Sequence, residues 1–149
     1  MKKVGIVRKN EVSFDQLLDL IKSSESIEEC GAIVAFIGIV RGISRDKKRI
    51  KKLIYEAEKN IAEEVMRNIR QEIIEKYSEV KDVIIYHIID ELNVSDETIY
   101  ILVSAKHREQ AFSAAKEALN RVKKEVPIWK KEVTINGEHW ILGDEVVKV

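Results

Sequence analysis

The sequence has 149 residues, enough for one domain, 1–149, that buries roughly two-thirds of its unfolded surface. Charged residues make up 35% of it, but 26 Lys and Arg balance 26 Asp and Glu, whereas a general nucleic-acid binder usually carries a basic excess. The longest apolar run, Ala32 to Val40, is about half the ~20 residues that a membrane span needs, and the N-terminus lacks the apolar region of a signal peptide. We therefore expect a single-domain, soluble, cytoplasmic protein that binds neither nucleic acid nor membrane.

The first part of the chain predicts a helix, a strand and a basic loop. Ser13 to Gln16 has the S-x-x-Q form of a capping box and indicates a short helix that runs to about Lys22. Gly31 precedes the apolar run Ala32 to Val40, which predicts a strand buried on both faces. The stretch from Arg41 to Lys52 carries seven Lys or Arg and one Asp. Its first half is expected to form a loop, and its second half to lead into a strand.

The rest of the chain predicts two long helices and four strands. Apolar residues recur at helical spacing from Glu58 to about Lys76, in a stripe that starts at Ile61. They recur again from His107 to Glu125, where small alanines allow close packing on a sheet. Strand patterns occupy Val83–Asp90, Glu97–Ala105, Trp129–Ile135 and Glu138–Leu142, and the last two flank Asn136-Gly137, a signal for a type I′ hairpin turn. This order predicts an α+β sandwich with a mixed or largely antiparallel sheet.

Three cationic residues stand at junctions between predicted elements, where anions commonly bind. Arg41 ends the apolar strand, and an arginine there either simply reaches solvent or binds a phosphate or carboxylate in a bidentate manner. His107 and Arg108 follow a strand and open a helix, whose free N–H groups and dipole attract an anion. Cations at this helix end oppose the dipole unless an anion pairs with them, which favours a functional role for this pair.

Two lysines lie on either side of the only proline, Pro127. Lys123 falls in the last helical turn, where a cation also interacts favourably with the helix dipole, so a structural role stays open. Lys130 follows on the next strand, where either it or Lys131 faces inward. A lysine held near other cations in a partly desolvated pocket has a lowered pKa and can act as an acid, a base or a nucleophile. Spacing alone does not decide between these roles.

Other kinds of active site find little support in the sequence. His87 and His139 are far from each other and from His107, without the spacing of a metal site. No glycine-rich nucleotide-binding motif or nucleophile elbow appears, although a Ser-His-Asp arrangement stays open. The single Cys30 excludes an internal disulfide and a cysteine-based zinc site. We therefore expect no metal.

The motifs together resemble those of the large, catalytic subunit of molybdopterin synthase. The resemblance covers most of the chain. The matching segments are GAIVAFIGIVRG at Gly31–Gly42, LIYE at Leu53–Glu56, HIIDELNVSDETIYILVSAKHREQAF at His87–Phe112, VPIWKKE at Val126–Glu132, and a tryptophan at Trp140.

The resemblance implies a sulfurtransferase reaction that needs no cofactor. The family converts a cyclic pyranopterin monophosphate into molybdopterin by inserting two sulfurs as a dithiolene. The sulfur arrives as a thiocarboxylate on the C-terminal Gly-Gly tail of a small ubiquitin-like subunit, and that tail threads into a pocket of the large subunit. Two large subunits form a homodimer at the centre of a heterotetramer. The implied fold is a ferredoxin-like core with a smaller, hammerhead-type β subdomain.

The resemblance also implies roles for individual residues. It makes Lys123 and Lys130 the catalytic lysines. The substrate-binding residues would be Arg41, His107 and Arg108, contributed by one protomer or by both, and the pocket-lining residues Phe36 and Leu119.

The main departure from the family pattern is the loop after Arg41, which is more basic than usual and could dock an acidic partner.

The competing interpretation is a non-enzymatic α+β module that binds a ligand or RNA. An RNA-binding sheet needs exposed aromatic residues, and the strands here carry mostly aliphatic ones.

Overall fold

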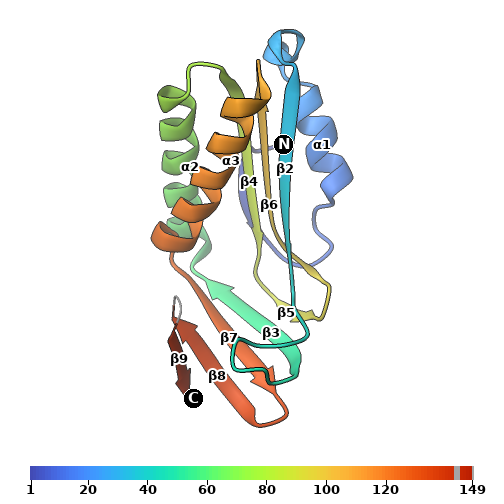
Figure 1. Ribbon diagram of the computed structural model, residues 1–149, viewed down its shortest axis with the longest axis vertical. Helices are drawn as coiled ribbons and strands as arrows, with labels where there is room; N and C mark the ends of the chain where they lie inside the picture. Colours follow the sequence, from blue (N-terminus) through green and yellow to red (C-terminus); the bar gives the residue numbers. More distant parts are fainter. Residues whose placement is uncertain (143–144, 149) are drawn as a thin grey trace.

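The structure is a computed structural model that describes residues 1–142 and 145–148 of the chain. Two β-sheets lie end to end, and the helices pack on only one of them (Figure 1). Within these residues, none of the helices is long and apolar enough to cross a membrane. The arrangement confirms the predicted α+β core with a smaller β subdomain.

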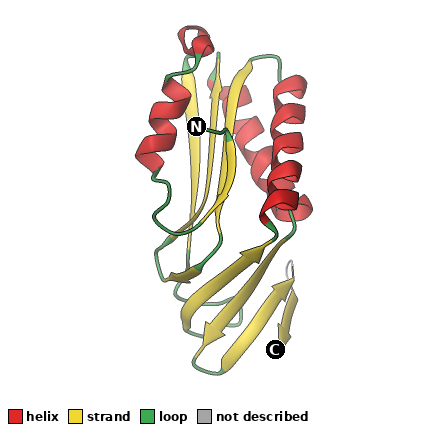
Figure 2. Ribbon diagram, turned by 180° about the vertical axis from the view of Figure 1, so that it is seen from behind, coloured by secondary structure: helices red, strands yellow, loops and turns green. Residues whose placement is uncertain are grey.

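The larger sheet has the order β1-β4-β6-β2. Its strands are β1 (Val4–Val7), β2 (Ala32–Ile39), β4 (Val80–Ile88) and β6 (Glu97–Ala105). β1 runs parallel to β4 and the other pairs are antiparallel, so the sheet is mixed as predicted. Helices α2 (Lys59–Lys76) and α3 (Arg108–Glu125) cover one face, and α1 (Phe14–Lys22) covers the other (Figure 2). Each face has its own apolar core, because both faces of β4 and β6 are buried.

The smaller sheet has the order β5-β3-β7-β8-β9 and is antiparallel throughout. Its strands are β3 (Ile50–Ala57), β5 (Glu91–Asn93), β7 (Ile128–Thr134), β8 (Gly137–Leu142) and β9 (Glu145–Lys148). β5 lies between the two predicted strands Val83–Asp90 and Glu97–Ala105, and it links the two sheets because it follows β4 directly. A short 3₁₀ helix, η1 (Glu25–Glu29), precedes β2.

Strand β2 is an edge strand that leaves alternate side chains exposed, so the prediction of a strand buried on both faces was wrong. It pairs with β6, and no strand lies on its other side within the described part of the chain. Ile37 and Ile39 keep 38% and 57% of their surface exposed. In a ferredoxin-like order the strand after α3 would lie beside β2, but β7 instead joins the smaller sheet. An unbroken apolar run does not distinguish a central strand from an edge.

The helices begin and end close to the predicted residues. The capping box is present, since the Ser13 hydroxyl accepts the Gln16 N–H at 3.2 Å and the Gln16 side chain accepts the Ser13 N–H at 2.9 Å. The predicted stripe of α2 is wrong at Ile61, which is 55% exposed. Its neighbour Ala62 is buried instead, because the stripe that faces the sheet continues through Met66, Ile69 and Ile73.

The predicted hairpin between β7 and β8 is confirmed, but the predicted type I′ turn is wrong. Thr134 pairs with Gly137, so the two loop residues are Ile135 and Asn136. A type I′ turn at Asn136-Gly137 needs a positive φ at both residues, and of the two only Gly137 has one, at 117°. The Thr134 hydroxyl accepts the Asn136 N–H at 3.1 Å and donates to the Gly137 carbonyl at 3.2 Å. This side chain moves the turn one residue towards the N-terminus.

Candidate functional site

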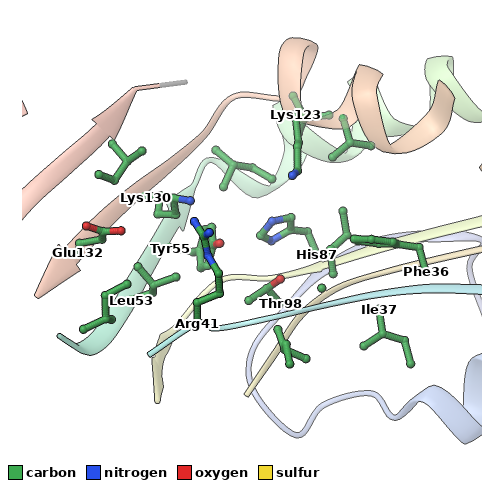
Figure 3. Close-up of a pocket in the computed structure, with 18 of the residues that line it drawn as sticks. Phe36, Ile37, Arg41, Leu53, Tyr55, His87, Thr98, Lys123, Lys130 and Glu132 are labelled. Atoms are coloured by element: carbon green, nitrogen blue, oxygen red, sulfur yellow. The ribbon is translucent and has the colours of Figure 1, made fainter. Parts of the chain in front are cut away.

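A cavity of about 640 Å³ lies where the two sheets meet at the C-terminal end of α3 (Figure 3). One part of its wall is cationic and includes Arg41, Lys123 and Lys130. Another part is apolar and includes Phe36 and Ile99. The remaining lining residues are Ile37, Gly38, Ile39, Arg45, Ile50, Leu53, Tyr55, His87, Thr98, Val122, Val126, Ile128, Glu132 and Ile141.

The chain reaches this cavity from both sides of Pro127. Lys123 lies in the last turn of α3, and Val126 closes the helix with its N–H bonded to the Val122 carbonyl at 3.1 Å. Proline cannot continue a helix, so the chain turns into β7 after it. β7 pairs with β3 so that Lys130 lies directly opposite Tyr55. The helix end and the strand therefore bring both lysines to one cavity.

The register of β7 decides which neighbouring lysine faces inward. Lys130 lines the cavity, together with Glu132 two residues further along the same face. Lys131 faces the opposite side, where its ammonium lies 5.2 Å from the centre of the Trp140 ring and 3.6 Å from a Glu138 carboxylate oxygen. Lys131 is thus a structural neighbour of the site rather than part of it.

The environment of Lys130 favours its neutral form. Burial of the side chain lowers the pKa of Lys130 below its usual value. The nearby charges of Lys123, Arg41 and Arg45 lower it further, while the buried carboxylate of Glu132 acts in the opposite direction. A lysine in such surroundings releases its proton more readily than an exposed one and can take part in proton transfer.

Two further residues of the cavity were not among the predicted site residues. Burial lowers the pKa of His87 to about 4, and burial also raises the pKa of Tyr55 to about 12. Their rings meet edge to face with centroids 4.9 Å apart. Sequence reasoning considered His87 only as a metal ligand. Both residues lie in segments that carry the family resemblance, Tyr55 in LIYE and His87 in HIID. That position was the signal by which the sequence could have identified them.

The other predicted site residues lie away from this cavity. His107 and Arg108 are at the opposite end of α3, with 70% and 80% of their side chains exposed, and their nearest charged partners are Glu79 and Glu109. Because Arg108 and Lys123 are fifteen residues apart on one helix, about 22 Å separates them. One chain therefore does not bring them together. Leu119 is half-buried and packs against the core beneath α2 and α3.

The chemistry available in the cavity is that of anion binding and proton transfer. Its cations can bind a phosphate or carboxylate, and its apolar wall can contact a flat ring. No three His, Cys, Asp or Glu side chains gather as metal ligands in residues 1–142 and 145–148. The fold and site thus define an α+β protein with a cationic cavity, built between two sheets, that holds a lysine with a lowered pKa.

The chain belongs to the MoaE family, whose model, described as MoaE protein, matches residues 7–125. It is 43% identical over 148 residues to the molybdopterin synthase catalytic subunit of Pyrococcus abyssi, covering 99% of this chain and 96% of the relative. It is 40% identical over 128 residues to that of Bacillus subtilis, covering 86% and 79%.

Solved structures agree with this assignment. The crystal structure of molybdopterin synthase from Staphylococcus aureus matches with a TM-score of 0.85 and 34% identity, over 95% of this chain and 98% of that one. A complex of subunits 1 and 2 of molybdopterin-converting factor from Helicobacter pylori matches with a TM-score of 0.74 and 17% identity, which shows the shared fold alone. These findings support the enzyme over the alternative of a non-enzymatic binding module.

Proposed function

We propose that this chain, as one domain over residues 1–149, is the catalytic subunit of a cytoplasmic molybdopterin synthase. It converts cyclic pyranopterin monophosphate to molybdopterin, and the sulfur comes from the thiocarboxylated Gly-Gly tail of a small ubiquitin-like subunit. Membership of the MoaE family supports this proposal. The observation that carries it is the convergence of Lys123 and Lys130 on one cavity, where burial lowers the pKa of Lys130.

The chemistry has two stages for each sulfur. The thiocarboxylate sulfur first attacks an oxygen-bearing side-chain carbon of the pterin, which leaves the tail attached as a thioester. The C–O bond of that carbon breaks, and its oxygen leaves as water or, where the carbon carries the cyclic phosphate, stays on the phosphate as that ring opens. Water then cleaves the bond between the acyl carbon and sulfur, so the tail leaves as a carboxylate and the pterin keeps the thiol. The tetrahedral intermediate of this hydrolysis carries negative charge on the acyl oxygen. In this proposal Lys130 and Lys123 stabilise that charge and exchange protons with it.

The substrate phosphate is held by Arg41 together with His107 and Arg108 of a second protomer. This division is supported by the length of α3, which keeps Arg108 about 22 Å from Lys123 of the same chain. A homodimer at the centre of a heterotetramer can place the start of one α3 near the end of the other. The edge of β2, which no described strand covers, and the exposed Ile37 and Ile39 are compatible with such an assembly.

The role of Lys130 is tested by comparing Lys130→Met with Lys131→Met. Each variant is mixed with thiocarboxylated small subunit and cyclic pterin, and dithiolene product is measured. Loss of one well-placed donor reduces turnover about 10²- to 10³-fold, so Lys130→Met should fall by that factor. Lys131→Met should retain nearly full turnover, because Lys131 faces Trp140 on the other side of β7. Near-normal turnover by Lys130→Met would contradict the assignment, and inactivity of the parent chain would contradict the proposed function.

The sharing of sites between protomers is tested by mixing two inactive variants, Lys130→Met and Arg108→Ala. A hybrid dimer has one site that combines the intact Lys130 of one chain with the intact Arg108 of the other. If half of the dimers are hybrids, mixing should restore about one quarter of the parental activity. If both residues served the same chain's site, every site would keep one defect and the mixture would stay inactive.

A further inference from the structure

His87 lies at the boundary between the charged and apolar parts of the cavity. It stands near the end of β4, is 7% exposed, and lines the cavity. In Figure 3 its ring lies between Phe36 on one side and the Arg41 and Lys130 side chains on the other. The proposed sulfur transfer gives this ring no task, although it is a titratable group at the centre of the site.

The hydrogen bond of His87 determines which ring nitrogen carries the proton. Nδ1 lies 2.9 Å from the carbonyl oxygen of Ile88, and a carbonyl can only accept, so Nδ1 is the donor. Burial and the nearby Lys130 charge keep the pKa of His87 at about 4, so the ring is neutral near pH 7. Nε2 is then unprotonated, and it has no hydrogen-bond partner among the described residues. The Tyr55 ring packed against the imidazole restricts its rotation.

Hydrogen-bond acceptors are few in a wall whose charged groups are mostly cations. The charged groups that face the cavity are Arg41, Arg45, Lys123, Lys130 and Glu132, and Tyr55 adds a hydroxyl. The cations suit the phosphate of a substrate, but they do not recognise the N–H groups of a heterocycle. Nε2 of His87 does, because a neutral imidazole nitrogen accepts one hydrogen bond in a fixed direction.

We propose that His87 is a specificity-determining residue whose Nε2 accepts a hydrogen bond from a ring N–H or amino group of the bound pterin. This inference rests on the proposed function and adds to it the assignment of separate parts of the cavity to the two parts of the substrate. The phosphate lies at the cationic wall, and the heterocycle lies between His87 and the apolar wall at Phe36. A ligand without an N–H donor in this position would leave the site's acceptor unpaired.

The test compares binding of cyclic pyranopterin monophosphate with binding of inorganic phosphate, by calorimetry and without the small subunit. His87→Phe keeps a flat ring beside Tyr55 but removes the acceptor, and should weaken pterin binding about 10- to 100-fold. Binding of inorganic phosphate should stay within about twofold, because no hydrogen bond to phosphate is lost. His87→Gln, whose side-chain carbonyl can accept, should bind the pterin more tightly than His87→Phe.

Three results distinguish failure of this inference from failure of the proposed function. Equal pterin binding by the parent chain and His87→Phe would overturn this inference and leave the proposed function intact. An equal loss of pterin and phosphate binding would also overturn it, since the effect would then be on the cavity as a whole. No binding of the pterin by the parent chain would contradict the proposed function itself.

A measurement on the unmodified chain provides an independent readout. Nitrogen NMR of ¹⁵N-histidine-labelled protein should show Nδ1 protonated and Nε2 unprotonated in His87, with the Nε2 signal shifting when the pterin binds. A protonated Nε2 in the free protein would overturn the inference.

Discussion

The burial of His87 predicts a specific loss of stability in acid. The folded chain holds the pKa of His87 at about 4, against an ordinary value of 6.5, so folding opposes protonation of this ring. Above pH 6.5 the ring is neutral in both states and stability is unaffected. As the pH falls from 6.5 to 4, the unfolded chain binds a proton that the folded chain does not, and stability is lost. At about 1.4 kcal/mol per pKa unit, the total loss is about 3 kcal/mol.

The measurement is urea unfolding of the parent chain and of His87→Phe at several pH values between 7.5 and 4.5. Protonation of carboxylates affects both proteins alike and cancels in the difference between their free energies of unfolding. That difference should therefore be constant above pH 7 and should shift by about 2 kcal/mol, to the disadvantage of the parent chain, by pH 5. His87→Gln should follow His87→Phe, because neither side chain titrates in this range. The same pH dependence in all three proteins would refute the reasoning.

Two further predictions concern buried carboxylates. The Asp82 side chain is 3% exposed and accepts hydrogen bonds from Lys3 at 2.6 Å and Arg70 at 2.8 Å. Asp82→Asn should lower the free energy of unfolding, measured by urea denaturation, by about 3 kcal/mol. A loss below about 1 kcal/mol would contradict this. The charge of Glu132 raises the pKa of Lys130. Glu132→Gln should therefore lower that pKa and move the limb of the pH–rate profile that is due to Lys130 to lower pH. An unmoved limb would show that Glu132 does not act on Lys130.

The parts of the fold that could be predicted from the sequence are those set by residues close together in the chain. The capping box joins Ser13 to Gln16, three residues apart, and the stripes of α2 and α3 repeat every three or four residues. The pairing of strands that lie far apart in the sequence could not be predicted in this way. The residues of Ala32–Ile39 do not indicate that β2 lies at the edge of the described sheet, and β5 is too short to show a pattern.

The candidate site shows the same difference between features set by nearby residues and features set by long-range pairing. Spacing placed Lys130 or Lys131 inward, but the choice depends on the register with β3, which starts more than seventy residues earlier. The resemblance assigned His107 and Arg108 to the same site as Lys123, whereas within one chain the eighteen residues of α3 hold them apart. His87 enters the cavity only because β4 ends where the two sheets meet.

The charges of the cavity couple anion binding to the protonation of Lys130. Without an anion, burial and the positive charges of Lys123 and Arg41 lower the pKa of Lys130 and make its proton easier to lose. An anion bound among these residues adds negative charge within a few ångströms of the ammonium, which favours the charged form and raises that pKa. Coupling between two binding events is reciprocal, so a protonated Lys130 in turn binds the anion more tightly. In the proposed function, a bound phosphate or thiocarboxylate would therefore keep Lys130 protonated and able to donate to the acyl oxygen.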